Sequence, residues 1–404
     1  MPDLSSWFVS KSQDYQLNKK VNLSSLKNLI SKLSIKPPKK IISITGTNGK
    51  GSTAFLINQV LSKKYKVGYY SSPHLVRPNE RIIIKNKYAS DSSIKESFKI
   101  IEEINNKELN FYQLFSLAAF NLFSKNDLDV WILEAGIGGR LDPINCFDAD
   151  ISIITNLALD HEEILGDDLE KIGYEKSGIL RKKQSLVYGD NFIPKSISKK
   201  IDELKVNFLQ NKKDFFLKKE NNFYEWNNIK IENCNIHSNS LALGLQTIEL
   251  IDETLINDSL FKLKSPIFKG RCHLIGNKFL VDVAHNENAA IHLRNFIKSN
   301  NLNNRKIYAV FSCSHNKNIE DIIKPFIDIV SSWAIPKINN DRLASQIHLK
   351  SLFKEKFNIE ISLHKSLKES LDLYNKNEEN PLILIFGSFY LAGEFYKEEA
   401  GLNV

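Results

Sequence analysis

A glycine-rich segment near the N-terminus constrains the fold of this chain most. The apolar run Lys40–Thr45 is followed by Gly46-Thr-Asn-Gly-Lys-Gly-Ser52 and then by a helical pattern that continues to about Lys64. A buried strand, a glycine-rich turn and a helix in this order form a phosphate-binding loop. Its backbone N–H groups and the helix N-terminus hold phosphates, and its lysine reaches the outer ones. The segment therefore predicts an α/β fold that binds a nucleotide.

The loop departs from the general phosphate-binding pattern at both ends. Ile44 stands where the first glycine would be, and Gly51 stands where Ser or Thr normally follows the lysine. The hydroxyl of the pattern must therefore come from Ser52 or Thr53. A plain glycine turn with a solvated lysine is the alternative, and the flanking strand and helix disfavour it. We expect the nucleotide to contact Thr47, Asn48, Gly49, Lys50, Gly51 and Ser52.

Apolar strands and helical patterns alternate along most of the chain. Further strands are expected at 66–72, 81–85, 130–134 and 151–156, with helices at 93–105, 112–125 and 169–180. A second alternation begins near Lys264, with strands at 278–283, 306–311 and 382–386 and helices at 288–299 and 319–330. This alternation is typical of a parallel sheet covered by helices on both faces.

The length of 404 residues exceeds what one hydrophobic core usually supports, which predicts two domains. We place their boundary near Pro266, in the connector 264–270. The expected fold class is α/β: a P-loop parallel-sheet ATPase domain, residues 1–265, is followed by a smaller Rossmann-like α/β domain, residues 266–404.

The net charge of +8 raises the question of a nucleic-acid partner. Lysine is spread along the chain beside abundant Ile and Asn, as AT-rich coding produces, and we favour this explanation over a dedicated binding face. Segment 197–232 mixes Lys with Phe and Trp, a composition that can bind single strands, but its short alternating runs fit a peripheral hairpin better. We expect no nucleic-acid partner; acidic small-molecule substrates would also suit the charge.

The remaining composition narrows the class of protein further. No apolar run approaches the roughly 18 residues of a membrane span, and residues 1–20 lack the features of a secretory signal, so we expect a cytoplasmic protein without membrane association. We also expect a monomer. The cysteines include no Cys-x-x-Cys pair, and the lone pair of Cys234 and His237 is a poor metal site. The cysteines are Cys146, Cys234, Cys272 and Cys313.

Polar residues follow the carboxyl ends of several expected strands. Glu134 ends the strand 130–134, as the acidic residue of a Walker B element does, and a carboxylate there suits a magnesium ion that bridges ATP phosphates. A solvated strand-end carboxylate is the alternative. Ser72 and the segment 156–161 follow two other strands. Because open α/β sheets bind ligands at this edge, we expect these groups to converge on one cleft.

The loop variant at 46–52 resembles the nucleotide loop of the Mur ligase superfamily. Within that superfamily the chain is similar to the folylpolyglutamate synthase family, including the bifunctional bacterial members that are also dihydrofolate synthases. The segments that carry this resemblance follow the order found in the family and span about residues 1–395. They are Ser71-Ser-Pro-His-Leu75 with Asn79-Glu-Arg81, Ile132-Leu-Glu-Ala-Gly-Ile-Gly-Gly-Arg-Leu-Asp142, Leu159-Asp-His161, Glu175-Lys-Ser-Gly178, Gly270-Arg271 and Asp282-Val-Ala-His-Asn286.

The resemblance implies an ATP-dependent ligase. ATP would phosphorylate a pterin-linked carboxylate, and the α-amine of L-glutamate would attack the acyl phosphate to give an amide, ADP and phosphate. The acceptor would be dihydropteroate, a reduced folate extended by γ-glutamyl groups, or both. The alternatives are a synthase that extends folates only and another Mur-type amide ligase. A peptidoglycan ligase would carry an N-terminal UDP-binding domain, for which the residues before the loop are too few.

The resemblance also implies the metal and catalytic residues. Ser72 and His161 would join Glu134 as magnesium ligands; without the family, a turn hydroxyl and a capping or packing histidine would be the plainer interpretations. Lys176 would be carbamylated and would hold a second magnesium ion, although it would otherwise pass for a solvated helix lysine. The expected catalytic groups are Lys50, Lys176, His161 and Arg271.

The remaining contacts concern ATP and the substrates. Asn239 would contact adenine and Arg271 phosphate, while Asp282 ends a strand and can accept hydrogen bonds from ribose hydroxyls in a nucleotide site closed by the second domain. His285 would orient glutamate or serve a structural role at the strand end. Gln113 stands where the family commonly has an acidic residue, and its amide can still bond a pterin edge. The expected pterin contacts are Phe111, Tyr112, Gln113, Leu141, Asp142 and Pro143.

Overall fold

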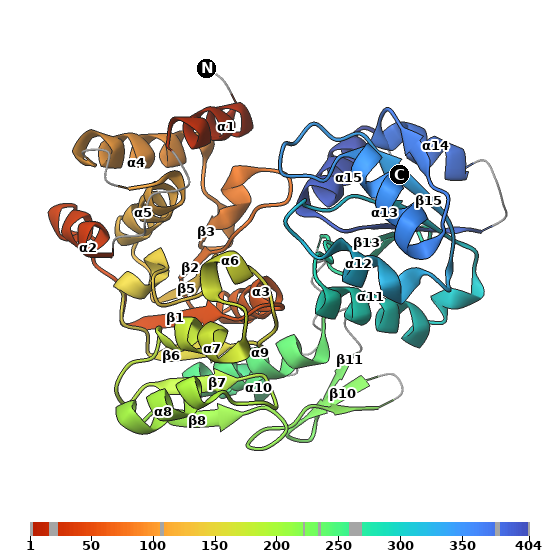
Figure 1. The fold of residues 1–404 in the computed structure, drawn as a ribbon. Coiled ribbons are helices and arrows are strands. Elements are labelled where there is room, and N and C mark those ends of the chain that lie inside the picture. The colour runs from red at the N-terminus through yellow and green to blue at the C-terminus, as the bar shows by residue number, and fades with distance from the viewer. Residues whose placement is uncertain are drawn as a thin grey trace. The chain divides into compact units, whose positions relative to one another are not determined.

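The structure is a computed structural model that describes residues 3–15, 23–105, 109–220, 223–232, 236–257, 269–375 and 380–402. The chain divides into two compact units, Met1–Pro266 and Ile267–Val404, and Figure 1 labels many of their helices and strands. The expected connector lies outside the described residues up to Phe268. No helix within the described ranges is long and apolar enough to cross a membrane.

The first unit is built on an eight-stranded sheet in the order β4–β3–β2–β5–β1–β6–β7–β8. The six strands from β2 to β8 are parallel, as expected, whereas β3 and β4 add an antiparallel edge. The strands are β1 (Lys40–Thr45), β2 (Val67–Tyr70), β3 (Ile82–Ile84), β4 (Lys87–Tyr88), β5 (Val130–Glu134), β6 (Ile151–Ile154), β7 (Ser185–Tyr188) and β8 (Asn207–Gln210).

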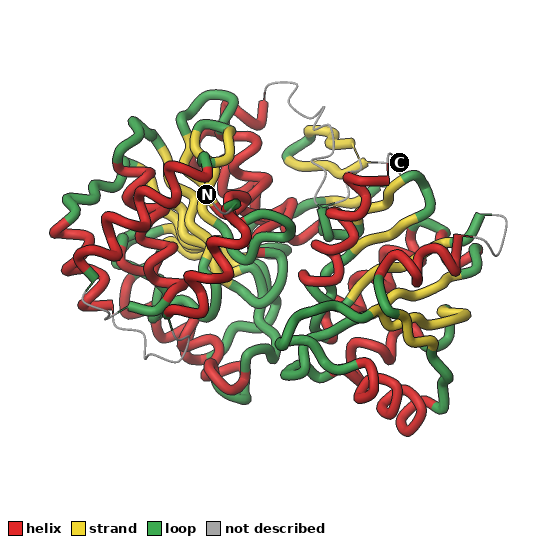
Figure 2. The backbone as a smooth tube through the Cα atoms, turned by 90° about the horizontal axis from the view of Figure 1, so that it is seen from above, coloured by secondary structure: helices red, strands yellow, loops and turns green. Residues whose placement is uncertain are grey.

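Helices cover both faces of this sheet (Figure 2). One hydrophobic cluster joins β1, β2 and β5 to α1 (Leu4–Asp14), α2 (Leu23–Lys32), α4 (Asp91–Ile104) and α5 (Phe111–Ser124). Another joins β6 and β7 to α7 (Leu169–Ser177) and α8 (Lys195–Leu204). Helices α3 (Lys50–Leu61) and α9 (Ser238–Asp252) pack against each other. The short elements are α6 (Glu162–Leu165), α10 (Thr254–Asn257), η1 (Pro78–Arg81) and η2 (Pro143–Cys146).

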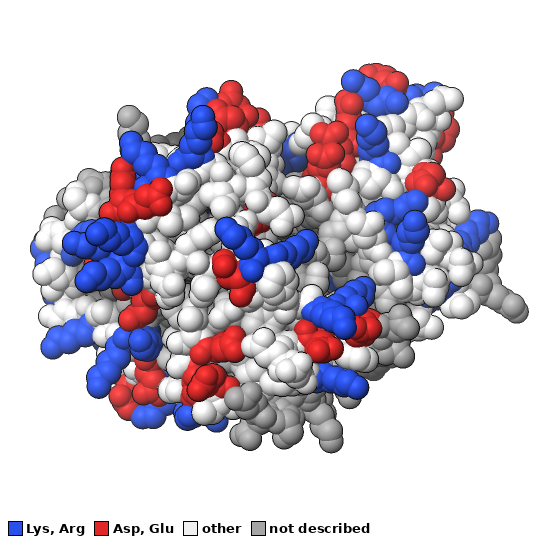
Figure 3. Space-filling model, turned by 90° about the horizontal axis from the view of Figure 1, so that it is seen from below, with Lys and Arg blue, Asp and Glu red and all other residues white. Residues whose placement is uncertain are grey.

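Segment 197–232 contains the expected hairpin in its second half. Strands β10 (Phe223–Trp226) and β11 (Ile229–Glu232) pair antiparallel, with β9 (Lys218–Lys219) on the other side of β10. The Trp226 side chain is buried, so one of the aromatic groups serves packing. Figure 3 shows one face of the molecule, on which basic and acidic side chains are interspersed instead of forming a basic stripe.

The second unit is also α/β, as predicted. Its six-stranded sheet has the order β12–β13–β17–β14–β15–β16, parallel except for β12. The strands are β12 (His273–Ile275), β13 (Phe279–Val281), β14 (Ile307–Phe311), β15 (Val330–Pro336), β16 (Ser362–His364) and β17 (Leu382–Phe386). The helices are α11 (Glu287–Ser299), α12 (Ile319–Ile323), α13 (Gln346–Phe357), α14 (Leu367–Asn375) and α15 (Phe389–Leu402), with η3 (Leu302–Asn304) and η4 (Lys324–Phe326).

The prediction of a helix at 319–330 is wrong for its second half. Helix α12 ends at Ile323, a single 3-10 turn follows, and Val330 already begins strand β15. Pro325 explains the early end, because proline has no N–H for the helical hydrogen bond and its ring clashes with the preceding turn.

An aromatic cluster dominates the core of the first unit. Phe120 is fully buried, and its ring lies 5.6 Å from Tyr70, 6.4 Å from Trp131 and 5.1 Å from Phe147. We predict that Phe120→Ala lowers the free energy of unfolding of this unit by about 3–5 kcal/mol, because it leaves a cavity. Urea denaturation followed by fluorescence measures this change. Phe192→Ala, at a side chain that is 52% exposed, is the matched control and should cost less than about 0.5 kcal/mol.

Candidate active site

The glycine-rich loop lies directly against the segment that follows β6. Gly46 has φ of 141°, and a Cβ atom at this position would lie 1.8 Å from Thr155 Oγ1. Gly49 caps α3 in a left-handed conformation, with φ of 83°. Any other residue at Gly46 would collide with Thr155, and a side chain at Gly49 would be strained. Both glycines are therefore required by the backbone.

Hydrogen bonds fix the loop to the same segment. Thr47 N donates to Asn156 O (3.1 Å) and Asn48 N donates to Asn156 Oδ1 (2.8 Å). In return, Thr155 Oγ1 donates to Asn48 O (2.6 Å). Asn156 begins the segment 156–161 that was expected at this site, whereas Thr155 was not predicted, although its position after a parallel strand is a usable signal. The loop is thus held in shape by its neighbour along the sheet edge.

Asn239 enters this network from the start of α9. Its Nδ2 donates to Thr155 O (2.9 Å), and its Oδ1 accepts from Asn211 Nδ2 (2.8 Å). The residue expected to contact adenine therefore lies beside the nucleotide loop, where its amide supports the segment that shapes the loop. Cys234, which precedes this helix and was considered a poor metal ligand, lies outside the described residues.

The side chain of Lys50 folds back onto its own loop. Lys50 Nζ donates to Gly46 O (3.0 Å) and Thr47 O (3.2 Å). Of the two candidate hydroxyls, Ser52 is half-buried, whereas Thr53 is fully buried and its Oγ1 has no hydrogen-bond partner within the described part of the chain. The structure therefore favours Ser52 as the hydroxyl that can reach a ligand.

Glu134 is the last residue of β5, and Ser72 follows the end of β2. Glu134 is only 4% exposed, and a Cβ atom at Gly51 would lie 3.5 Å from its Oε2, so the carboxylate faces the start of α3. A Cβ atom at Gly136 would lie 3.3 Å from Ser72 Oγ. The absence of side chains at these glycines keeps room around both oxygen groups.

Lys176 is a buried cation near the same place. It lies in the last turn of α7 and is 2% exposed. Burial, together with the nearby charge of Lys50, lowers its pKa to about 7, and Asp160 opposes the shift. His161 follows Asp160 at the start of α6, with its Nε2 3.9 Å from Asp160 Oδ2. Lys50 and Asp160 thus lie near enough to Lys176 to act on its charge.

A metal would need a mixed ligand set here. Within the described ranges, no group of three or more His, Cys, Asp or Glu side chains is placed to hold a metal ion. The expected set includes only two residues of these types, Glu134 and His161, so Ser72, Lys176 and ligand oxygens would have to supply the remaining positions. Oxygen donors of this kind suit a hard divalent cation.

The expected pterin residues fall into an internal network and one exposed side chain. Tyr112 Oη donates to Asp142 Oδ2 (3.2 Å), and Gly136 N donates to the same oxygen (2.9 Å). Burial raises the pKa of Asp142 to about 6 and holds that of Tyr112 well above its usual value. Gln113 is buried, and its Oε1 accepts from Asn110 N as part of a capping box. Phe111 and Pro143 are buried as well, whereas Leu141 is 38% exposed.

Three expected residues lie in the second unit. The guanidinium of Arg271 lies 5.2 Å from the centre of the Phe389 ring, and the His285 ring lies 5.8 Å from the same ring. Asp282 is buried, and its two oxygens accept from Cys272 N and Ala284 N, both at 2.7 Å. Burial raises its pKa. Arg271 and His285 thus share one aromatic neighbour, while the Asp282 carboxylate shapes the surrounding backbone.

Known proteins resemble this chain along its whole length. Residues 44–248 match the Mur ligase middle domain, and residues 275–398 match the dihydrofolate synthetase C-terminal domain. A Buchnera aphidicola (subsp. Schizaphis graminum) protein named dihydrofolate synthase/folylpolyglutamate synthase is 35% identical, over 93% of this chain and 92% of its own length.

Solved structures agree with these matches. E. coli FolC in complex with DHPP and ADP superposes with a TM-score of 0.90 at 26% identity, covering 100% of this chain and 99% of that one. A bifunctional folylpolyglutamate synthase/dihydrofolate synthase with Mn, AMPPNP and L-glutamate bound gives a TM-score of 0.86 at 27% identity, with coverage of 100% and 99%.

The two hydroxyls of the loop helix provide a test of this geometry. We predict that Ser52→Ala weakens binding of magnesium-ATP by about tenfold, the worth of one hydrogen bond to a charged group. Thr53→Val should leave binding unchanged and raise the free energy of unfolding by about 1 kcal/mol, because it removes a buried hydroxyl that has no partner. Titration with a fluorescent ATP analogue and urea denaturation measure the two effects. The opposite pattern would assign the ligand contact to Thr53.

Proposed function

Because this chain belongs to the Mur ligase family, in the group named dihydrofolate synthase/folylpolyglutamate synthase, we propose that it joins L-glutamate to a pterin-bearing acid with ATP. It is an ATP-dependent carbon–nitrogen ligase. The supporting observation is a phosphate loop beside a buried carboxylate, Glu134, and a buried lysine, Lys176. The acceptors proposed are dihydropteroate and reduced folates; a folate-extending enzyme that does not accept dihydropteroate is the second candidate.

The reaction needs positioning and charge stabilisation, not a protein nucleophile. The substrate carboxylate attacks the γ-phosphorus of ATP, ADP leaves, and an acyl phosphate forms. The amine of glutamate then attacks the acyl carbon, phosphate leaves, and the amine gives up a proton as the amide forms. We assign phosphate binding to the N–H groups of residues 49–52, because those of Thr47 and Asn48 already donate to Asn156. Lys50 would exchange the carbonyls of Gly46 and Thr47 for phosphate oxygens.

The proposed metal ligands are Glu134, Ser72 and His161, with Lys176 as a carbamate for a second ion. Divalent ions bound there would neutralise charge on the phosphates during transfer. The burial of Glu134 and Lys176 fits this role, because both groups would otherwise be costly to keep in the interior. A lysine whose pKa is about 7 is largely neutral at slightly alkaline pH, and the neutral amine adds carbon dioxide and releases one proton.

The substrate contacts remain proposals of the same kind. Asp142 and Tyr112 would bond the pterin edge. Because the Asp142 carboxylate already accepts from Tyr112 Oη, Gly136 N and Ile144 N, a pterin donor would take the place of Tyr112 Oη, the longest of these contacts. Phe111, Gln113 and Pro143 would pack behind Asp142 and Tyr112, and the exposed Leu141 would contact the pterin ring. From the second unit, Arg271 would bind phosphate, Asp282 the ribose and His285 glutamate.

The central experiment measures ADP and amide formation with ATP, magnesium, L-glutamate and either dihydropteroate or a reduced folate. Product from both acceptors supports the bifunctional enzyme, and product from the folate alone supports the second candidate. We predict that Lys50→Ala and Glu134→Ala each lower turnover by at least about a hundredfold while the fold persists, because each removes charge stabilisation at the phosphates. Lys63→Ala and Glu96→Ala, at exposed positions, are the matched controls. Near-normal turnover in Lys50→Ala or Glu134→Ala would contradict the site assignment.

Lys176 provides a separate prediction. Lys176→Ala should abolish most of the activity, and acetate or a similar short carboxylate should restore part of it by occupying the position of the lost carbamate. Addition of bicarbonate should activate the wild-type enzyme more as pH rises through about 7, because the neutral amine is the reactive form. Rescue is measured by ADP release at increasing acetate concentration. An equal response to acetate in Lys50→Ala would show that the effect is nonspecific.

A further inference from the structure

The end of α7 that carries Lys176 is fastened by groups from outside the helix. Arg140 N donates to Glu175 O (2.7 Å), and the Arg140 guanidinium also binds the Glu175 carboxylate (2.8 Å). Beyond the helix, Gly178 O accepts two hydrogen bonds, from Asn145 Nδ2 (3.1 Å) and Arg181 Nη1 (3.2 Å). The backbone is therefore held on both sides of Lys176, at positions 175 and 178.

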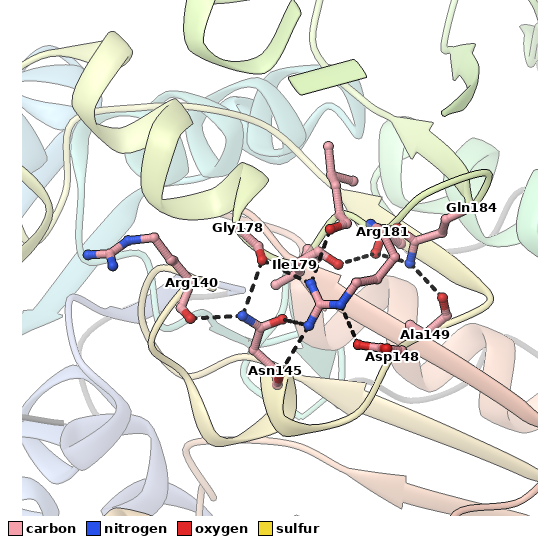
Figure 4. Close-up of polar contacts among 10 residues, drawn as sticks. Arg140, Asn145, Asp148, Ala149, Gly178, Ile179, Arg181 and Gln184 are labelled. Carbon is pink, nitrogen blue, oxygen red and sulfur yellow. Dashed lines mark hydrogen bonds and ion pairs between the residues drawn. The ribbon is translucent and has the colours of Figure 1, made fainter. Parts of the chain in front are cut away.

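Asn145 connects this helix end to a second loop, residues 136–142, which follows Glu134. Its Nδ2 donates both hydrogens, one to Arg140 O (2.8 Å) and one to Gly178 O (Figure 4). Its Oδ1 accepts from Arg181 Nη2 (2.8 Å). Asn145 is 8% exposed, so its amide group is largely removed from water. One amide thus joins the loop 136–142 to the connection that follows α7.

Further hydrogen bonds, from Arg181 and Gln184, hold Asn145 in place. Arg181 donates to the Asn145 carbonyl oxygen (3.1 Å) and to Leu180 O (3.1 Å), and its Nε binds Asp148 at the surface. Gln184 Oε1 accepts from Arg181 N (2.8 Å), and its Nε2 donates to Ala149 O (2.8 Å). Figure 4 shows that Arg181 lies between Asn145 and Asp148.

Close packing of backbones leaves little freedom between the two segments. A Cβ atom at Gly178 would lie 2.3 Å from Arg140 Cβ, and one at Gly139 would lie 3.1 Å from Lys176 O. The loop and the helix end touch through glycine positions, so their separation is set by the backbones and by the Asn145 amide. A shift of either segment would move Lys176 relative to the loop that begins at Glu134.

We propose that Asn145 is a positioning residue: its two donated hydrogen bonds, to Arg140 O and Gly178 O, hold Lys176 at the distance from Glu134 that metal binding requires. This inference rests on the proposed function of Lys176. Asn145 is not among the substrate or metal contacts proposed above, and its side chain bonds to Arg140 O, Gly178 O and Arg181. Supporting groups of this kind orient the ligands of a metal site and commonly change metal affinity when they are replaced.

The test uses Asn145→Asp, which removes both donated bonds and keeps the size and the acceptor for Arg181. The full-length protein is equilibrated with 13C-bicarbonate, and the carbamate resonance, assigned by its loss in Lys176→Ala, is followed by NMR. Binding of Mn2+ with AMPPNP is measured by EPR. We expect Asn145→Asp to lose most of the resonance and to weaken Mn2+ binding by about tenfold. Asn145→Ser, which also removes the hydrogen bonds to Arg140 O and Gly178 O, replaces Asn145→Asp in the test if that variant does not fold.

Asp148→Asn is the matched control, because it changes the exposed far end of the same network and leaves both donated bonds of Asn145 in place. It should keep the resonance and the Mn2+ affinity of the wild type. If Asn145→Asp keeps both and merely unfolds at a lower temperature, Asn145 is structural and the inference is wrong. A wild type without the resonance would overturn this inference and the carbamate together. Ligase turnover of the wild type, measured separately, decides the proposed function.

Discussion

The contact between Gly46 and Thr155 is the constraint on which the nucleotide loop depends. A Cβ atom at Gly46 has no space, and Thr155 Oγ1 is hydrogen-bonded to Asn48 O. The loop therefore takes its shape from the connection after β6, and Asn239 on α9 supports that connection through Thr155 O. Segments that are far apart in sequence are joined at the carboxyl ends of the strands, which is where parallel sheets bind ligands.

Features governed by local chemistry could be predicted from the sequence. The strand and glycine pattern at 40–52 located β1, the loop and the start of α3, and the apolar runs located β5, β14 and β17. Glu134 could be placed at the carboxyl end of a strand for the same reason. Pro325 was a visible signal that helix 319–330 would end early, but the apolar residues on both sides of it continued the helical pattern and concealed the start of β15.

Features set by distant contacts could not be predicted in this way. Nothing in the residues around Asn145 indicates that its amide would bridge Arg140 and Gly178, because both acceptors are backbone carbonyl groups, which every residue has. The choice between Ser52 and Thr53 likewise depends on which face of α3 packs inward. The buried setting of Lys176 followed only from the family resemblance, since its helix has ordinary polar neighbours in sequence.

The antiparallel strands β3 and β4 have a consequence for colloidal behaviour. A sheet of parallel strands would otherwise expose a long row of unpaired N–H and C=O groups, to which another chain could add. Here the edge strand β4 has two residues, both exposed, and one of them is Lys87. A short, charged edge offers few groups for such pairing. The outermost hairpin thus limits edge-to-edge association on this side of the sheet.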